Sequence, residues 1–306
     1  MAPRLGLGGG VTANPASGLF AAPTATPLLD TYANAHRAYS VRKLRTDYSG
    51  YAMKVRRADN NEADVAFDAS GRVSGSSMIA NPDSGGVSDL DTWVGSGGSD
   101  HCYVSLWYDQ SGEGVNAVQA DTDDQPKLYN AGSLITVGDP ARAALRLDGS
   151  NDWFHVDEVG LVMGATTVFA LFKNATTDNN QVPWGLSNNP GNYFLHLNYG
   201  GENQFWYDAG EIADHPIDTD QNLWAYKGGL GAQRMYKNGT ASDETGTNTA
   251  ANAHILSNMV GNGIGSYSGS AFHWAGEFQE FIAYDSDQTS NRTAIEADIN
   301  TEFGLS

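Results

Sequence analysis

The sequence predicts an all-β protein with a few short helices. Three features support this prediction. Glycine is abundant, at 36 of 306 residues, Asn, Asp and Ser gather in short clusters, and the apolar runs between those clusters are brief. Such clusters form turns, and several short runs at regular spacing are typical of a β-sandwich or barrel. With 40% hydrophobic content, the chain can bury one large core or two modest ones.

The net charge of −19 is unevenly distributed. Residues 1–57 hold eight of the 17 Lys and Arg residues against two acidic residues, which makes this segment +6. The rest of the chain carries nine basic and 34 acidic residues, or −25. A body this acidic repels phosphate backbones and anionic lipid surfaces at long range. We therefore expect neither a nucleic acid nor a membrane as the main partner.

Cys102 is the only cysteine, which excludes an internal disulfide framework. It lies in an apolar run, so we expect an inert buried thiol and not a nucleophile. The amino terminus lacks a charged region followed by an apolar core, and no run approaches the roughly 20 apolar residues of a membrane span. The sequence thus predicts a protein that is made and folded in a cytoplasm, without a signal peptide.

Residues 1–27 are rich in Gly, Ala, Pro and Thr and hold few large apolar side chains. Such a segment buries too little surface to order itself. Two interpretations stay open: a flexible tail, or an extended arm that becomes ordered by docking on another subunit. With the second interpretation, the chain belongs to a homo-oligomer or to a larger assembly.

The first half of the body predicts two helices and several short strands. Residues 28–44 have apolar side chains at mostly helical spacing after an Asp30 or Thr31 N-cap, so we expect a helix there. Residues 51–57 alternate in character, and we interpret their basic side chains as the solvated face of a strand. A short helix is expected at residues 89–94.

Residues 103–107 form an apolar run that leads into the turn sequence Asp109-Gln-Ser-Gly112. An Asp at the first position of such a turn normally accepts hydrogen bonds from the backbone ahead of it. We therefore interpret Asp109 as a turn residue and not as a catalytic acid.

Short strands separated by turn clusters fill the second half of the chain, at the spacing of a sandwich. Asn238 and Gly239 form a hairpin signal of the Asn-Gly kind. The predicted strands cover residues 166–173, 192–199, 203–208, 223–228, 233–237 and 276–284.

Three segments together resemble the amino-terminal part of the catalytic domain of arabinofuranosidase B-type glycosidases. They are Tyr39-Ser-Val-Arg-Lys-Leu-Arg45, Tyr48-Ser-Gly-Tyr-Ala-Met-Lys-Val-Arg-Arg57, and Trp107-Tyr-Asp-Gln-Ser-Gly112 with Asn116. The same pattern occurs in uncharacterised bacterial and phage proteins. From Arg146-Leu-Asp-Gly-Ser-Asn-Asp152 onward, the order of landmarks is similar to a laminin-G-like, concanavalin A-like domain that closes with a helix near residues 292–303.

This resemblance implies a concanavalin A-like two-sheet β-sandwich, or jelly roll, with an extended N-terminal arm and a few short helices. The expected division is an arm at residues 1–27 and one sandwich domain at residues 28–306. The N-terminal extension of that domain covers residues 28–143.

A glycosidase needs two carboxyl groups that converge on one bond. The best local pair, Glu277 and Glu280, is three residues apart, so the two side chains should point to opposite faces of a strand unless a bulge intervenes. The resemblance matches the nucleophile strand of the family to residues 167–172, which contain no carboxylate. The sequence therefore predicts no catalytic residue and favours a protein that is not an enzyme.

Two acidic runs offer hard oxygen ligands for calcium: residues 121–124, and Asp148 with Asn151 and Asp152. The resemblance supports such a site, since laminin-G-like domains often carry one calcium ion. The alternative is an exposed acidic turn without a metal. The seven His residues are scattered, so the sequence does not support a zinc site.

Polar and aromatic side chains share one face of the two strands predicted at residues 192–199 and 203–208. Aromatic rings stack on sugars, and Asn, Asp, Gln and His bond their hydroxyl groups. The alternative is that the aromatic side chains here cover the core or the sheet. The predicted glycan-binding residues are His196, Asn198, Gln204, Trp206 and Asp208.

These features favour a non-enzymatic component of a phage virion, which decorates the particle or binds a receptor through a lectin-like domain and so contacts cell-surface glycans. Its N-terminal arm is then expected to contact other subunits of the virion. Two alternatives stay open: a glycoside hydrolase related to arabinofuranosidases, and a cell-surface carbohydrate-binding adhesion module.

Overall fold

The computed structural model describes residues 26–305, apart from gaps at 84–85, 87, 97–100, 158, 163–165, 178–179, 188–191, 200, 208–209, 229–231, 244, 247–254, 258–262 and 267–270. The predicted arm therefore lies almost entirely outside the described residues. Cys102 carries a buried free thiol, as the sequence predicts. None of the described helices has the length and apolar character that a membrane span requires.

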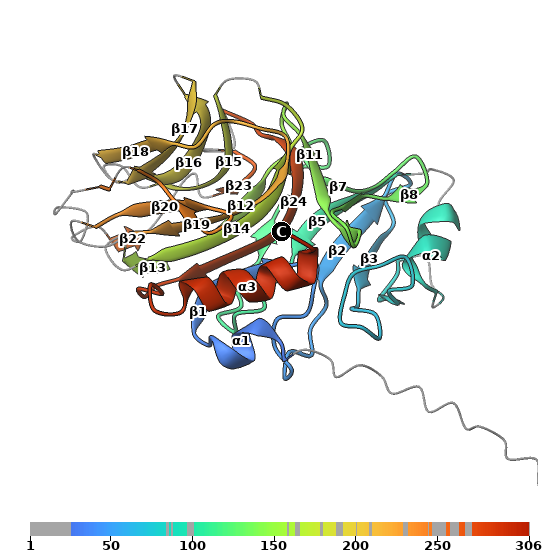
Figure 1. Cartoon of the computed structure of the whole chain (residues 1–306). Helices are drawn as coiled ribbons and strands as arrows, with labels where there is room; N and C mark the ends of the chain where they lie inside the picture. The colour runs from blue at the N-terminus through green and yellow to red at the C-terminus, as the bar shows by residue number, and fades with distance from the viewer. Residues whose placement is uncertain are drawn as a thin grey trace, which may run out of the picture.

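The protein is an all-β sandwich built from antiparallel strands, which confirms the predicted fold class (Figure 1). In spatial order, the strands of the first sheet are β4 (Ile79–Ala80), β3 (Glu62–Val65), β2 (Met53–Arg57), β5 (Cys102–Trp107), β7 (Lys127–Asn130), β11 (Leu145–Asp148), β24 (Ala275–Tyr284), β14 (Thr167–Asn174), β19 (Gln221–Lys227), β20 (Arg234–Lys237) and β21 (Thr240–Ala241).

The second sheet packs against the first and is joined to it where β5 pairs with β6. Its strands are β6 (Ala117–Val118), β12 (Phe154–Val156), β23 (Gly263–Ile264), β15 (Gln181–Ser187), β16 (Asn192–Tyr199), β17 (Glu202–Tyr207) and β18 (Gly210–Asp214). The remaining pairs are β1 (Ala35–Ser40) on β24, β8 (Ser133–Leu134) on β7, β9 (Thr136–Val137) on β10 (Arg142–Ala143), and β13 (Val159–Val162) on β22 (Ile255–Ser257).

Aromatic side chains fill the space between the two sheets. The ring of Trp184 on β15 lies 5.1 Å from that of Tyr226 on β19 and 5.7 Å from that of Phe281 on β24, measured between centroids. Phe205 on β17 lies 4.9 Å from Tyr226. Each such side chain contributes roughly 1.5–3 kcal/mol by its burial. Because these rings come from both sheets, they hold the two layers together.

The predicted helix over residues 28–44 is wrong beyond its first turn. α1 covers only Leu28–Thr31, Asn34 has a φ of 65°, and the chain then enters β1. β1 pairs with β24, where Tyr39 lies opposite Phe281. Helix propensity is a weak local preference. Pairing with a strand far along the chain therefore outweighs it.

The interpretation of the basic run as a solvated strand face is wrong for its two arginines. Arg56 and Arg57 are 8% and 4% exposed. The guanidinium of Arg57 lies 4.7 Å from the ring centroid of Trp93 in α2 (Leu90–Ser96), the short helix that the sequence predicts. The guanidinium of Arg56 lies 4.8 Å from the ring centroid of Tyr103. A weakly hydrated guanidinium is readily buried against an aromatic face.

The expectation that Glu277 and Glu280 point to opposite faces is also wrong. Their partners on β14 are Lys173 and Leu171, which are two residues apart and so share a face. A bulge places the extra residue Gln279 in β24 between them. Both carboxylates therefore lie on the same face of the sheet.

α3 (Arg292–Phe303) packs on the first sheet, where it contacts β19, and is drawn in red in Figure 1. Ile295, Ile299 and Phe303 are buried beneath it. Gly304 ends the helix with a φ of 70°, a left-handed conformation that suits glycine. The closing helix implied by the resemblance is therefore present.

The six strands predicted in the second half correspond to β14, β16, β17, β19, β20 and β24. The predicted hairpin joins β20 to β21, with Lys237 opposite Thr240. Asn238 and Gly239 have φ values of 49° and 79°. Two positive φ values are the signature of the tight hairpin turn that Asn-Gly favours.

Candidate functional site

Asp109 organises the turn that follows β5. Its Oδ1 atom accepts hydrogen bonds from the backbone N–H groups of Ala38 and Ser111, at 3.0 and 2.9 Å. Its Oδ2 atom accepts from those of Gly114 and Val115, at 3.0 and 3.3 Å. Both oxygens are occupied and the residue is 5% exposed. The structure confirms that Asp109 is a turn residue.

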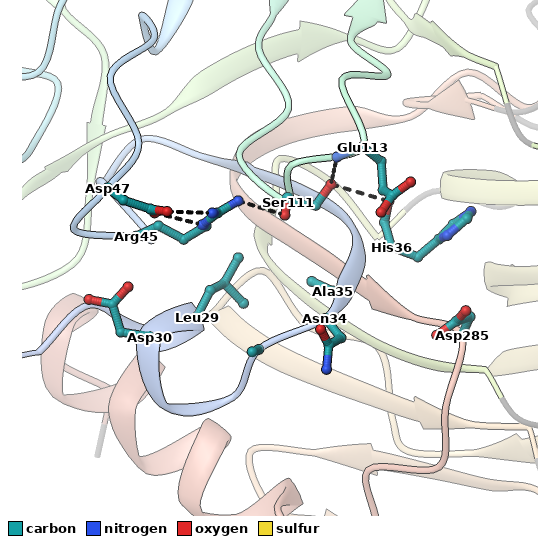
Figure 2. A pocket seen from close by; sticks show the side chains of 11 residues that line it. Leu29, Asp30, Asn34, Ala35, His36, Arg45, Asp47, Ser111, Glu113 and Asp285 are labelled. Carbon is teal, nitrogen blue, oxygen red and sulfur yellow. Dashed lines mark hydrogen bonds and ion pairs between the residues drawn. The ribbon is translucent and has the colours of Figure 1, made fainter.

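A pocket of about 410 Å³ lies beside this turn, and we call it the motif pocket (Figure 2). Arg45 and Asp47 lie on one side of it, and His36 and Asp285 lie on the other. Its lining is polar and includes four acidic residues. The lining residues are Leu29, Asp30, Ala33, Asn34, Ala35, His36, Arg45, Asp47, Ser111, Glu113 and Asp285.

Two of the four acidic side chains in the motif pocket are held by structural contacts. Arg45 donates two hydrogen bonds to Asp47, at 2.9 and 2.7 Å. Asp30 accepts hydrogen bonds from the backbone and side chain of Thr46. These contacts explain half of the acidic lining as loop structure.

A second pocket, of about 390 Å³, lies between β2, β5, β7 and the turn after β11, and we call it the turn pocket. It brings three carboxyl groups together with two cations, an aromatic ring and two side-chain amides. The lining residues are Arg56, Ala58, Asn60, Tyr103, Thr122, Asp123, Gln125, Lys127, Asp148 and Asp152.

Asp148 and Asp152 are joined across the turn after β11. The N–H of Asp148 donates to Oδ2 of Asp152 at 3.0 Å. Oδ1 of Asp148 accepts from the N–H groups of Ser150 and Asn151, at 2.7 and 3.3 Å. Within the described part of the chain, Oδ1 of Asp152 and Oδ2 of Asp148 accept no hydrogen bond. Each carboxyl group therefore keeps one oxygen for a ligand.

The electrostatics of the turn favour a proton on Asp152. Burial, together with the nearby charges of Asp148 and Asp124, raises the pKa of Asp152 to about 7. Asp152 is 5% exposed and lines the turn pocket. A carboxyl group with this pKa keeps its proton in about half of the molecules at pH 7 and can donate it to a bound ligand.

The predicted calcium ligands Asp148, Asn151 and Asp152 do lie together at this turn. The side-chain amide of Asn151, however, donates its N–H groups to the Asp123 carbonyl at 3.0 Å and to Oδ1 of Asp124 at 2.6 Å. Among the residues that the structure describes, no group of three or more His, Cys, Asp or Glu side chains is placed to hold a metal. Calcium binding at this turn stays a prediction.

The predicted glycan-binding residues are only partly described. The side chain of Trp206 and the whole of Asp208 lie outside the described residues. His196 and Gln204 lie opposite each other on β16 and β17 and are 4% and 8% exposed. Burial lowers the pKa of His196 to about 4, so its ring is neutral at pH 7.

Asn198 lies in an irregular stretch of β16 and has a φ of 54°. Its side-chain N–H donates to the carbonyl of Thr177 at 2.7 Å. The structure thus brings His196 and Gln204 together and turns Asn198 toward a neighbouring loop. Glycan binding by this set of residues stays a prediction.

No family model and no curated protein sequence matches the chain. Solved structures do match it. A GH54 α-L-arabinofuranosidase soaked with a cyclic sulfate inhibitor matches with a TM-score of 0.62 and 16% identity, over 88% of this chain and 63% of that one. An arabinofuranosidase complexed with arabinofuranosyl-α-1,2-xylobiose matches with a TM-score of 0.59 and 16% identity over the same shares. The chain has the fold of these proteins and spans about 63% of their length.

These similarities correct the expectation of a non-enzymatic phage virion component. Three solved structures that match with TM-scores near 0.6 are arabinofuranosidases, in line with the resemblance seen in the sequence. They give no support to a phage context.

Sequence reasoning named Asp148 and Asp152 as metal ligands but missed the pocket around them. Tyr103 and Lys127 complete its lining because their strands, β5 and β7, pair in the register that sets these two residues side by side. Strand register depends on which strands meet, so alternation within one strand cannot show it. The one sequence feature that pointed to this pocket was the charged residue Lys127 at the start of the apolar strand Lys127-Leu-Tyr129.

Proposed function

We propose that the chain is a glycoside hydrolase related in activity to arabinofuranosidases and that the turn pocket is its active site. The proposal rests on one observation above all. The carboxyl groups of Asp148 and Asp152 share one pocket, and each keeps an oxygen that no described neighbour occupies. Glycoside hydrolysis generally uses two such carboxyl groups. The likeness to arabinofuranosidase structures supports the same class of reaction.

In this proposal, the two carboxyl groups have different roles. Asp152 is the general acid, because its raised pKa keeps a proton available near neutral pH for the leaving oxygen of the glycosidic bond. Asp148 is held by backbone N–H groups through Oδ1 and presents Oδ2. Its negative charge stabilises the positive charge that develops on the sugar ring in the transition state.

The rest of the lining suits the hydroxyl groups of a sugar. Arg56 donates to Oε1 of Gln125 at 2.8 Å and to Oδ1 of Asn60 at 3.1 Å, which orients both amides. Asn60 then offers its amide N–H groups to a ligand, and the half-buried ring of Tyr103 offers an edge for packing.

The test is the release of arabinose from 4-nitrophenyl α-L-arabinofuranoside and from arabinan. We expect the protein to hydrolyse at least one of them, and Asp152→Asn and Asp148→Asn each to lower the rate by about 100-fold or more. Glu113→Gln removes a carboxylate from the motif pocket and serves as the matched control, with the rate unchanged. Absence of hydrolysis, or loss of activity in Glu113→Gln while Asp152→Asn stays active, would sink the proposal.

A further inference from the structure

A row of polar side chains crosses the outer face of the first sheet and starts in the turn pocket. In an antiparallel sheet, residues that lie directly opposite each other share a face. Six such pairs follow one another across seven strands, and we call the seven residues the cross-sheet row. The pairs are Arg56–Tyr103, Tyr103–Lys127, Lys127–Arg146, Arg146–Glu277, Glu277–Lys173 and Lys173–Gln221.

Side-chain contacts agree with this arrangement. The ammonium of Lys127 lies 5.9 Å from the ring centroid of Tyr103, and Nε of Arg146 donates to Oε1 of Glu277 at 2.9 Å. Neighbouring strands are about 4.8 Å apart, so the row extends over roughly 29 Å. It is therefore long enough to contact an extended chain and not only a single sugar.

The row is a cationic strip on an acidic protein. Four of its seven residues are Lys or Arg and one is Glu, whereas the whole chain carries a net charge of −19. The side chain of Arg146 is 43% exposed. Lys127 and Lys173 are half-buried and form no ion pair within the described part of the chain. Like charges side by side, such as Lys127 and Arg146, destabilise a sheet. Glu277 already offsets the charge of Arg146, and an anionic ligand that lies across the pair offsets the charge of Lys127.

The β9–β10 hairpin covers the sheet along one side of the row. Two residues beyond Glu277 on β24, Gln279 is 0% exposed because the β9–β10 hairpin covers it. The side-chain N–H of Gln279 donates to the carbonyl of Ala143 in that hairpin at 3.2 Å. An extended ligand is therefore guided along the row, from the turn pocket over β11 and β24 to β14.

We propose that the cross-sheet row binds an acidic polysaccharide whose sugar residues carry carboxylate groups. This inference rests on the proposed function, since the row leads into the turn pocket. Lys127, Arg146 and Lys173 contact the carboxylates, and Glu277 separates Arg146 from Lys173. A nucleic acid carries a phosphate on every nucleotide, and the acidic surface outside the row repels such a dense polyanion.

The test compares binding of polygalacturonate with binding of neutral arabinan, by calorimetry on the Asp152→Asn protein so that no substrate is consumed. We expect polygalacturonate to bind and its affinity to fall with added salt. Lys127→Gln combined with Lys173→Gln is expected to lower the affinity about tenfold. The matched control is Lys43→Gln combined with Lys54→Gln, which removes the same charge from half-buried positions outside the row and leaves the affinity unchanged.

Three outcomes would overturn the inference: polygalacturonate fails to bind, the control pair of variants weakens binding as much as the row pair, or duplex DNA binds to the row as tightly. The two proposals can fail separately. Salt-sensitive binding of polygalacturonate to the row without hydrolysis of any substrate removes the proposed function alone. Hydrolysis of the arabinofuranoside without polygalacturonate binding removes the inference alone.

Discussion

Arg42 and Glu280 form a buried, two-pronged ion pair. Nε of Arg42 lies 2.8 Å from Oε2 of Glu280, and Nη2 lies 3.0 Å from Oε1. Glu280 also accepts a hydrogen bond from Oγ of Ser40 at 2.6 Å, and Arg42 reaches Asp298 of α3 at 2.7 Å. Glu280 is 1% exposed. The pair thus ties together β24, α3 and the chain just after β1.

Glu280→Gln removes the carboxylate charge from this pair and leaves the buried guanidinium with a single charged partner. We expect a loss of about 3 kcal/mol in the free energy of unfolding, measured by urea titration. Glu277→Gln breaks the comparable pair with Arg146, whose side chain is 43% exposed, and is expected to cost less than about 1 kcal/mol. Equal losses in the two variants would show that burial does not decide the strength of these pairs.

Asp109→Ala removes the acceptor for four backbone N–H groups around the turn after β5. Buried donors that lose their partner are costly, so we expect a loss of about 3 kcal/mol in the free energy of unfolding. The hydrolysis rate per folded molecule, measured below the unfolding transition, should stay at the wild-type value. A fully folded Asp109→Ala protein without activity would instead give Asp109 a direct role in the reaction.

The stability of the protein should depend on the protonation of Asp152. The native state holds this proton more tightly than the unfolded chain, with a pKa of about 7 against the usual 3.8. The contribution of protonated Asp152 to the free energy of unfolding is therefore fully present below pH 3.8 and is lost as the pH rises through 7.

Asp152→Asn keeps an oxygen for the N–H of Asp148 but removes the charge. It should therefore raise the free energy of unfolding at pH 8 by about 2 kcal/mol. This is about half of the value that the pKa shift gives at 1.36 kcal/mol per pKa unit, because solvent in the pocket screens the charge. At pH 4 it should change stability little. Thermal melts at the two pH values measure this difference, with the exposed Asp123→Asn as control. An equal effect of Asp152→Asn at both pH values would contradict it.

The pH dependence of catalysis should report the same group. If Asp152 is the general acid, kcat/KM falls as the pH rises through about 7, because the carboxyl group loses the proton that it must donate. The measurement is the rate of arabinofuranoside hydrolysis between pH 5 and 9 under conditions where the protein stays folded. A rate that stays constant from pH 6 to 8.5 would exclude Asp152 from this role.

Local features of the sequence were sufficient for the fold class. Turn residues and alternating side chains act over a few positions, so the sequence predicts six strands of the second half and the Asn238-Gly239 hairpin close to their observed bounds, but it does not predict β15 or β18. Asp109 was recognised for the same reason, since its hydrogen bonds reach mainly to the next few residues.

Features that depend on distant segments were predicted incorrectly or not at all. The helix predicted over residues 28–44 covers β1, because the pairing of β1 with β24 is invisible in the local pattern. Simple alternation predicts opposite faces for Glu277 and Glu280, because the bulge at Gln279 arises only when β24 meets β14.

The sequence by itself determined that this is an all-β protein with an acidic body, a buried lone thiol and an Asp-centred turn, because composition and short-range patterning control those properties. Only the tertiary structure decided that Asp148 and Asp152 share a pocket with Tyr103 and Lys127, and that Lys127, Arg146 and Lys173 fall into one row. The physical reason is strand register, because the partners that a side chain meets across a sheet are set by the packing of whole strands.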